Sequence, residues 1–235
     1  MRSAFQILKD TFLKILNNKK TFLFIIALPA LISAAVSLIE PDVDAKGAYI
    51  WTSSSHMAEF FTAVIVLSIV SIFMTIATIF AASNDQLDAV DSYKLASKKV
   101  LQYLLMTIIS TLILLISFLL LVIPGIWLSI SLMFAIYFLV LKNTNSVESL
   151  KSSFRLVKGR WWTVLGKSLL FGLMYIAIAI PVYIALWIIG NFAGEDLQFA
   201  FESIVTVFGS LVAILFMYEL FTDLEKTKVE SVVAS

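Results

Sequence analysis

The sequence predicts an all-α, polytopic membrane protein with six transmembrane helices, arranged as three hairpins with amphipathic juxtamembrane helices. Of its 235 residues, 60% are hydrophobic and 14% are charged, whereas a soluble domain is about half apolar and about a quarter charged. Apolar runs of about 20 residues, the length that crosses a bilayer core, recur along the chain. Lys and Arg concentrate in alternate segments between these runs. The composition excludes a soluble globular protein, a disordered chain and a protein that binds nucleic acid.

The apolar runs predict six spans within one domain that covers residues 1–235. They lie at 21–39, 60–82, 100–123, 126–141, 168–189 and 199–221. The third and fourth spans come from one uninterrupted run, which is about twice as long as a single span needs to be. Pro124 and Gly125 interrupt this run, and a Pro-Gly pair is a turn signal. We therefore expect a tight turn at Pro124 and Gly125 between two antiparallel helices.

The distribution of basic residues predicts the orientation of the chain. If both termini are cytoplasmic, 16 of the 17 Lys and Arg residues lie in inner segments and only Lys46 lies outside. Inner loops of membrane proteins carry this excess of Lys and Arg. The outer loops carry acidic residues instead, namely Glu40, Asp42, Asp44, Glu195 and Asp196. We expect both termini to be cytoplasmic, which requires an even number of spans.

Tryptophans are expected to mark both membrane interfaces. In the six-span arrangement Trp51, Trp127 and Trp187 fall near the outer interface, and Trp161 and Trp162 fall near the inner one.

Three cytoplasmic segments, at 3–17, 87–99 and 146–158, are predicted to form amphipathic helices before spans one, three and five. They contain the similar stretches AFQILKDTFL, SYKLASKKVL and SFRLVKGRWW. One interpretation is an internal repeat of three units, each a juxtamembrane helix followed by a hairpin. The other is that any helix at the inner interface carries aromatic and basic residues. The sequence leaves both open.

The third of these segments has the clearest helix signals. Asn145 followed by Glu148 resembles a capping box, and Gly159 predicts the C-terminal end. Helical spacing places four apolar side chains on one face: Val147, Leu150, Phe154 and Val157.

Residues that could carry chemistry are scarce. The chain has no cysteine and one histidine, His56, which excludes disulfides and thiolate metal sites. The central parts of the spans hold no ionisable residue, and such residues are the usual markers of transport or proton relay. Charges lie only near the span ends, at Glu59 and Glu202 outside and at Lys167 and Glu219 inside. We therefore predict no cofactor, no metal and no enzymatic activity.

Two groups of residues are candidates for a structural or binding role. Pro29 and Pro181 lie near the middle of spans one and five, where proline either kinks a packed helix or marks a hinge or cavity lining. The densest basic cluster is Lys151, Arg155, Lys158 and Arg160. We favour contact of this cluster with lipid headgroups. The alternatives are a purely topogenic signal and the docking of a cytoplasmic partner.

One stretch resembles a known family. Ile123-Pro124-Gly125-Ile126, a further span, and then SVESLKSSFRLVKGRWW are similar to the membrane domain attached to some bacterial glycerophosphoryl diester phosphodiesterases. Related stand-alone six-span bacterial membrane proteins share this pattern. The match covers roughly 121–170, through Glu148, Leu150, Lys151, Ser153, Lys158 and Gly159, with Ser149 in place of the usual alanine. The resemblance implies a six-helix fold in the bacterial cytoplasmic (inner) membrane. It does not carry over phosphodiesterase activity, because the catalytic barrel is a separate soluble domain.

These observations favour a non-enzymatic scaffold or a module that binds partners or lipids. Its expected partners are membrane lipids, a membrane protein or further copies of the chain, and not nucleic acid. The alternative is a small permease or lipid-handling transporter. A transporter should enclose a polar cavity at mid-membrane. The hydroxyl groups that could line one belong to Ser68, Ser71, Thr75, Ser110, Ser117, Ser129, Ser131 and Tyr175.

Overall fold

The computed structural model describes residues 1–37, 39, 42–43, 49–50, 53–193 and 195–233. The helices are α1 (Ala4–Asn17), α2 (Lys19–Ser37), α3 (Ser54–Ser83), α4 (Ala89–Ser97), α5 (Val100–Leu120), α6 (Val122–Leu132), α7 (Ala135–Leu141), α8 (Ser146–Val157), α9 (Trp161–Ala193) and α10 (Glu195–Val233). Between α2 and α3, β1 (Asp42–Val43) and β2 (Tyr49–Ile50) form a short antiparallel pair. Within the described part, six helical segments are long and apolar enough to cross a membrane, which confirms the all-helical, membrane-type fold.

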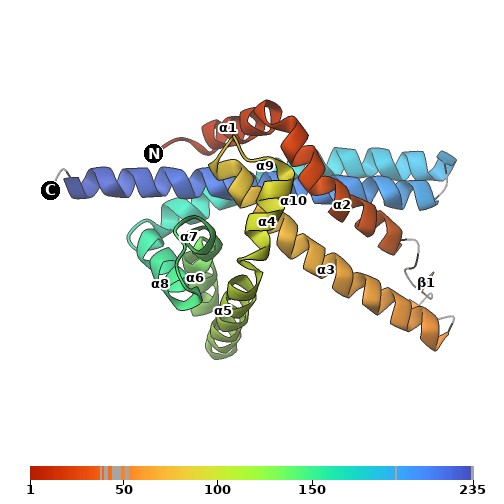
Figure 1. Cartoon of the computed structure of the whole chain (residues 1–235), viewed down its shortest axis with the longest axis horizontal. Helices are drawn as coiled ribbons and strands as arrows, with labels where there is room; N and C mark the ends of the chain where they lie inside the picture. The colour runs from red at the N-terminus through yellow and green to blue at the C-terminus, as the bar shows by residue number, and fades with distance from the viewer. Residues whose placement is uncertain (38, 40–41, 44–48, 51–52, 194, 234–235) are drawn as a thin grey trace.

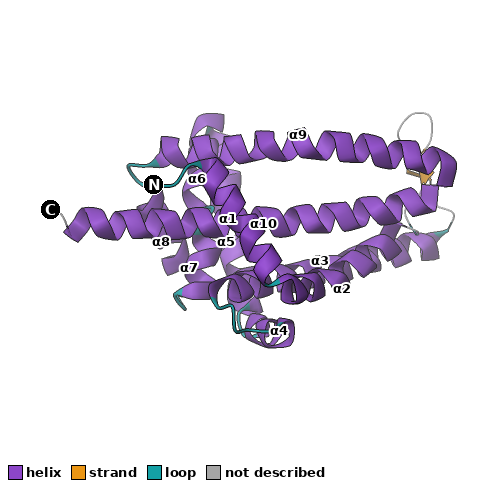
Figure 2. Ribbon diagram, turned by 90° about the horizontal axis from the view of Figure 1, so that it is seen from above, coloured by secondary structure: helices purple, strands orange, loops and turns teal. Residues whose placement is uncertain are grey.

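Helix α10 is the centre of the molecule. In its apolar stretch 56% of the residues are buried, against 11% in α5 and in α9. Side chains from α2, α7 and α9 pack around it; Phe171 stacks on Phe216, with ring centroids 4.2 Å apart, and Tyr137 stacks on Phe221 at 5.4 Å. Helices α2, α3, α9 and α10 extend toward one end of the molecule, and both termini lie at the other end (Figure 1, Figure 2).

The three predicted juxtamembrane helices are present as α1, α4 and α8. Ser3 and Gln6 form a reciprocal capping box at the start of α1. Asn145 begins α8 by accepting a hydrogen bond from the Glu148 backbone N–H at 2.9 Å. Gly159 follows α8 with φ +82°, a conformation that favours glycine. The predicted start and end of this helix are therefore confirmed.

The buried face of α8 differs from the prediction at one position. Val147 is 47% exposed, whereas Ser149 and Ser153 are fully buried beside Leu150 and Val157. Hydrophobic spacing missed these two serines because it counts only apolar side chains.

The turn inside the long apolar run lies before Pro124 and not at the Pro-Gly pair, so that part of the prediction is wrong. The chain is extended at Leu121, and Pro124 lies in the first turn of α6. Proline is tolerated in a first turn because the N–H that it lacks would have no partner within the helix. Gly125 is buried against the ring of Phe118 on α5. A Cβ there would lie 2.5 Å from ring atoms, so Gly125 allows the two helices to approach closely.

The fourth predicted span, 126–141, is two helices and not one. It is interrupted at Met133 and Phe134, between α6 and α7. The buried hydroxyl of Ser153 on α8 bridges the break: it donates to the carbonyl of Ser131 at 2.8 Å and accepts from the N–H of Phe134 at 3.1 Å. Because these backbone groups have a partner, the interruption is compatible with an apolar surrounding.

The two prolines predicted as kinks or hinges lie inside continuous helices. Pro29 is buried within α2, and Pro181 is exposed within α9. A hinge role for either stays a prediction.

Candidate functional site

A group of six charged side chains joins α1, α9 and α10 at the end of the molecule where the termini lie. Arg2 contacts Asp10 at 2.6 Å, Glu219 at 3.1 Å and Asp223 at 3.4 Å. Lys14 lies 3.4 Å from Glu219, and Lys167 lies 3.2 Å from Asp223. We call this set the Arg2 cluster. It holds three cations and three carboxylates, so its formal charges balance.

The Arg2 cluster holds α1 and α9 against α10. Glu219 and Asp223 are one turn apart on the central helix, and their side chains are only 10% and 8% exposed. The backbone N–H of Arg2 also donates to both carboxylate oxygens of Asp223 at 3.2 Å. Partial burial of the Arg2 guanidinium alone would lower its pKa, but the hydrogen bonds that it donates to Asp10 and Glu219 outweigh that effect and raise it. The Arg2 guanidinium therefore stays charged at all physiological pH values.

The sequence singled out only two members of this cluster. Lys167 and Glu219 were expected as separate charges near the membrane surface, but each is paired with a carboxylate or a cation from another helix. Arg2 and Asp223 are 221 positions apart in the chain, and no local pattern connects them.

The predicted basic cluster divides into two parts. Lys151, Arg155 and Lys158 are exposed on α8 and just after it. Arg160 instead binds the C-terminal part of α10: it donates to the Leu224 carbonyl at 3.1 Å and to the Thr227 hydroxyl at 2.7 Å. Arg160 thus fixes α9 to α10, and three basic residues remain for an external ligand.

Lys151 and Arg155 line a groove of about 540 Å³ between α5, α6 and α8. Its apolar side is formed by Ile113, Leu128, Leu132, Leu150 and Phe154. Glu148 is the single acidic side chain in the lining, and it is bonded to Arg155. The groove therefore combines an apolar wall with a net positive charge of one, an arrangement that suits an anionic amphiphile.

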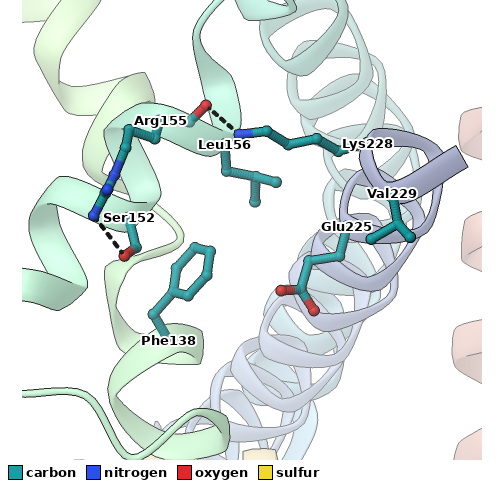
Figure 3. A pocket seen from close by; sticks show the side chains of 7 residues that line it. All are labelled: Phe138, Ser152, Arg155, Leu156, Glu225, Lys228 and Val229. Atoms are coloured by element: carbon teal, nitrogen blue, oxygen red, sulfur yellow. Dashed lines mark hydrogen bonds between the residues drawn. The ribbon is translucent and has the colours of Figure 1, made fainter. Parts of the chain in front are cut away.

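A second groove, of about 450 Å³, lies on the other side of α8, between α7 and the C-terminal part of α10. Figure 3 shows Phe138, Leu156 and Val229 around this space, with the Arg155 guanidinium turned toward Ser152. Lys228 bridges the two helices by donating to the Arg155 carbonyl at 2.9 Å. The lining contains Glu225, which pairs with Lys142 at 3.1 Å. The formal charge of the lining is plus one, as in the first groove, but the Lys228 ammonium is held by the Arg155 carbonyl.

A third groove, of about 390 Å³, is almost entirely apolar and lies between α1, α2, α9 and α10. Tyr175 contributes the one hydroxyl among its described lining residues. Most other candidate hydroxyls bond within their own helices: Ser68, Thr75, Ser110, Ser129 and Ser131 donate to backbone carbonyls three or four residues earlier. This groove therefore offers space for a hydrocarbon chain and not a polar path.

The remaining candidates have structural partners. Ser53 caps α3 by accepting from the His56 N–H at 3.1 Å, and the His56 ring lies 3.0 Å from the Ile39 carbonyl. Glu202 accepts from Gln198 at 2.8 Å, and Glu59 is exposed. Among the described residues, no group of three or more His, Cys, Asp or Glu side chains could hold a metal ion.

Comparison with known proteins gives a family and no function. No curated protein and no solved structure matches the chain. One family model matches residues 21–224, which is most of the sequence and includes α2 through the buried part of α10. The chain therefore belongs to the family described as Domain of unknown function (DUF7847).

Proposed function

We propose that this chain is a non-enzymatic membrane protein that binds anionic phospholipids of the cytoplasmic leaflet through α8. The observation that carries the proposal is the groove in which Lys151 and Arg155 border an apolar wall. An arginine fork and a lysine ammonium are both good partners for a phosphate group. The adjoining apolar side chains of α5 and α6 can take the upper part of an acyl chain.

The proposed location is the bacterial cytoplasmic membrane with both termini in the cytoplasm. Two observations support this orientation. The excess of Lys and Arg falls in the inner segments, and both termini lie at the end of the molecule that carries α8 and the Arg2 cluster (Figure 1).

Removing the two groove cations together should weaken the binding of anionic lipid. Each basic residue near an anionic leaflet contributes about 1 kcal/mol, so Lys151→Gln with Arg155→Gln should reduce affinity roughly thirtyfold. Native mass spectrometry of the protein in nanodiscs that contain phosphatidylglycerol and phosphatidylcholine measures this as the loss of retained phosphatidylglycerol.

The matched control removes two charges from another exposed segment that is expected to be cytoplasmic. It combines Lys94→Gln on α4 with Lys98→Gln directly after α4. This control should retain phosphatidylglycerol as the unmodified protein does. Equal losses in both double variants would show a general effect of charge and would refute a site on α8.

A lipid-handling transporter is the second candidate, and the apolar groove between α1, α2, α9 and α10 is the observation that favours it. The two candidates differ in one measurable property. A transporter would speed the transfer of fluorescent phosphatidylglycerol between the leaflets of proteoliposomes, whereas a binding module leaves the rate at that of protein-free liposomes. If transfer is accelerated, Gly209→Leu should slow it, because a side chain at this position overlaps the Tyr175 hydroxyl in the groove.

A further inference from the structure

The α5–α6 hairpin stands apart from the other long helices. Both views show it lying across the direction of α9 and α10 and not alongside them, near the end where the termini lie (Figure 1, Figure 2). Its packing partners are chiefly its own two helices and α8. Its outward surface is apolar and includes the tip, where Leu119 is 84% exposed and Ile123 is 81% exposed.

The contacts of Trp127 fix the depth of this hairpin. The six-span arrangement places Trp127 at the outer interface and Trp161 at the inner one, about 30 Å apart. In the structure the Trp161 indole N–H donates to the Trp127 carbonyl at 3.1 Å. The Trp127 ring also lies edge-on to Phe154 of α8, with centroids 5.2 Å apart. The prediction that Trp127 and Trp161 lie at opposite interfaces is therefore wrong.

The tip of the hairpin lies close to the membrane depth at which Trp127 and Trp161 meet. Trp127 follows the turn at Leu121 by less than two helical turns, or about 9 Å along α6. Trp161 begins α9, directly after Arg160, which binds α10 beside the Arg2 cluster. A hairpin that crossed the bilayer would instead hold its tip at the end where α2 joins α3.

The composition of the tip agrees with a position inside hydrocarbon. Phe118 through Leu128 contains no charged side chain, whereas the segment between α2 and α3 carries Glu40, Asp42 and Asp44, and α10 begins with Glu195 and Asp196. The backbone also exposes few donors. The Leu121 N–H donates to Ser117 at 3.0 Å, the Gly125 N–H donates to Leu121 at 3.3 Å, and Pro124 has no N–H. A turn with few free donors is the kind that an apolar surrounding tolerates.

We infer that the α5–α6 hairpin enters the membrane from the cytoplasmic side and returns without crossing it, with its tip among the acyl chains of that leaflet. The chain then has four crossing helices, α2, α3, α9 and α10, and one re-entrant hairpin. Four crossings are an even number, so both termini remain on one side and the same 16 of 17 Lys and Arg residues remain inside. The occupant of the exposed hairpin surface is the hydrocarbon of one leaflet.

Single cysteines test this arrangement directly, because the chain has none of its own. Ile123→Cys and Leu119→Cys report on the tip, and both side chains are highly exposed, so neither change should disturb folding. Ser54→Cys at the start of α3 is the outer reference, and Lys158→Cys after α8 is the inner one. A membrane-impermeant maleimide is applied to intact spheroplasts and then to inside-out vesicles.

We expect both tip cysteines to react at least tenfold more slowly than Ser54→Cys in spheroplasts and than Lys158→Cys in inside-out vesicles. A bimane label at position 123 should then be quenched by lipids that carry a nitroxide along the acyl chain. Reaction of the tip from outside, at a rate within threefold of Ser54→Cys, would overturn the proposal in favour of a crossing hairpin. Reaction from the cytoplasmic side at the rate of Lys158→Cys would also overturn it, since the tip would then lie in water.

Discussion

Replacing Asp223 with alanine should lower the free energy of unfolding by about 3 kcal/mol, because it breaks a buried ion pair and leaves its partner charged. Asp223 accepts from the Lys167 ammonium and from the Arg2 backbone and guanidinium. The Lys167 side chain is only 12% exposed, so water cannot compensate for the lost carboxylate. Unfolding by SDS in mixed micelles, followed through the fluorescence of the five tryptophans, measures this change.

Glu225→Ala is the matched control for Asp223→Ala. Glu225 also lies on α10, two residues further along, and also pairs with a lysine, Lys142. That pair is more exposed, so its loss should change the free energy of unfolding by less than about 1 kcal/mol. Equal effects of the two substitutions would show that the Arg2 cluster does not hold α1 and α9 to α10.

Ser153→Ala should destabilise the protein by about 2–4 kcal/mol. The substitution leaves two buried backbone groups, the Phe134 N–H and the Ser131 carbonyl, without their hydroxyl partner. Each unsatisfied buried group costs about 1–3 kcal/mol. The same SDS titration measures the loss. Hydrogen exchange at Phe134 and its neighbours should increase as well, because the interruption between α6 and α7 opens.

Ser152→Ala is the control for this second substitution. Ser152 is adjacent in sequence but only half-buried, and its hydroxyl lies 3.4 Å from Glu148. Its replacement should change stability by less than about 0.5 kcal/mol. A comparable loss at both serines would mean that Ser153 contributes helix propensity or packing and not the bridge to α6 and α7.

Most helices of this protein could be predicted because their signals are local. Apolar runs identified the long helices, and the Asn145 cap and Gly159 fixed the ends of α8 within a residue or two. The predicted span 60–82 lies within α3, which begins six residues earlier with a first turn that contains Ser54, Ser55 and His56. The repeat of three juxtamembrane units stays a prediction, although a helix is present in each of the three segments. The resemblance to the phosphodiesterase-linked membrane domain also stays a prediction.

The errors have a common physical origin in contacts between distant parts of the chain. A continuous apolar run gives no sign that α6 ends at Leu132, because the group that stabilises the break is Ser153, which lies on α8. Counting basic residues cannot distinguish a crossing hairpin from a re-entrant one, since both preserve the side on which every Lys and Arg lies. The contact between Trp127 and Trp161, which bears on that difference, joins residues 34 positions apart in the chain.

Only part of the candidate site could be predicted, again because some of its contacts join distant parts of the chain. Lys151 and Arg155 were found from charge density alone, and they line the groove that supports the proposed function. Arg160 lies in the same basic stretch of sequence, but its side chain binds Thr227 on α10. No local signal connects the members of the Arg2 cluster, because they come from α1, α9 and α10 and from the residues just before α1.

The length of α10 has a mechanical consequence. Its 39 residues extend about 58 Å, whereas a bilayer with its headgroups is about 40–45 Å thick. A helix this long responds to a thinner bilayer by tilting. Its protruding end is tied to α8 through Lys228 and to the start of α9 through Arg160. We therefore expect a tilt of α10 to move α8 as well, so that bilayer thickness would act on the groove around Lys151 and Arg155.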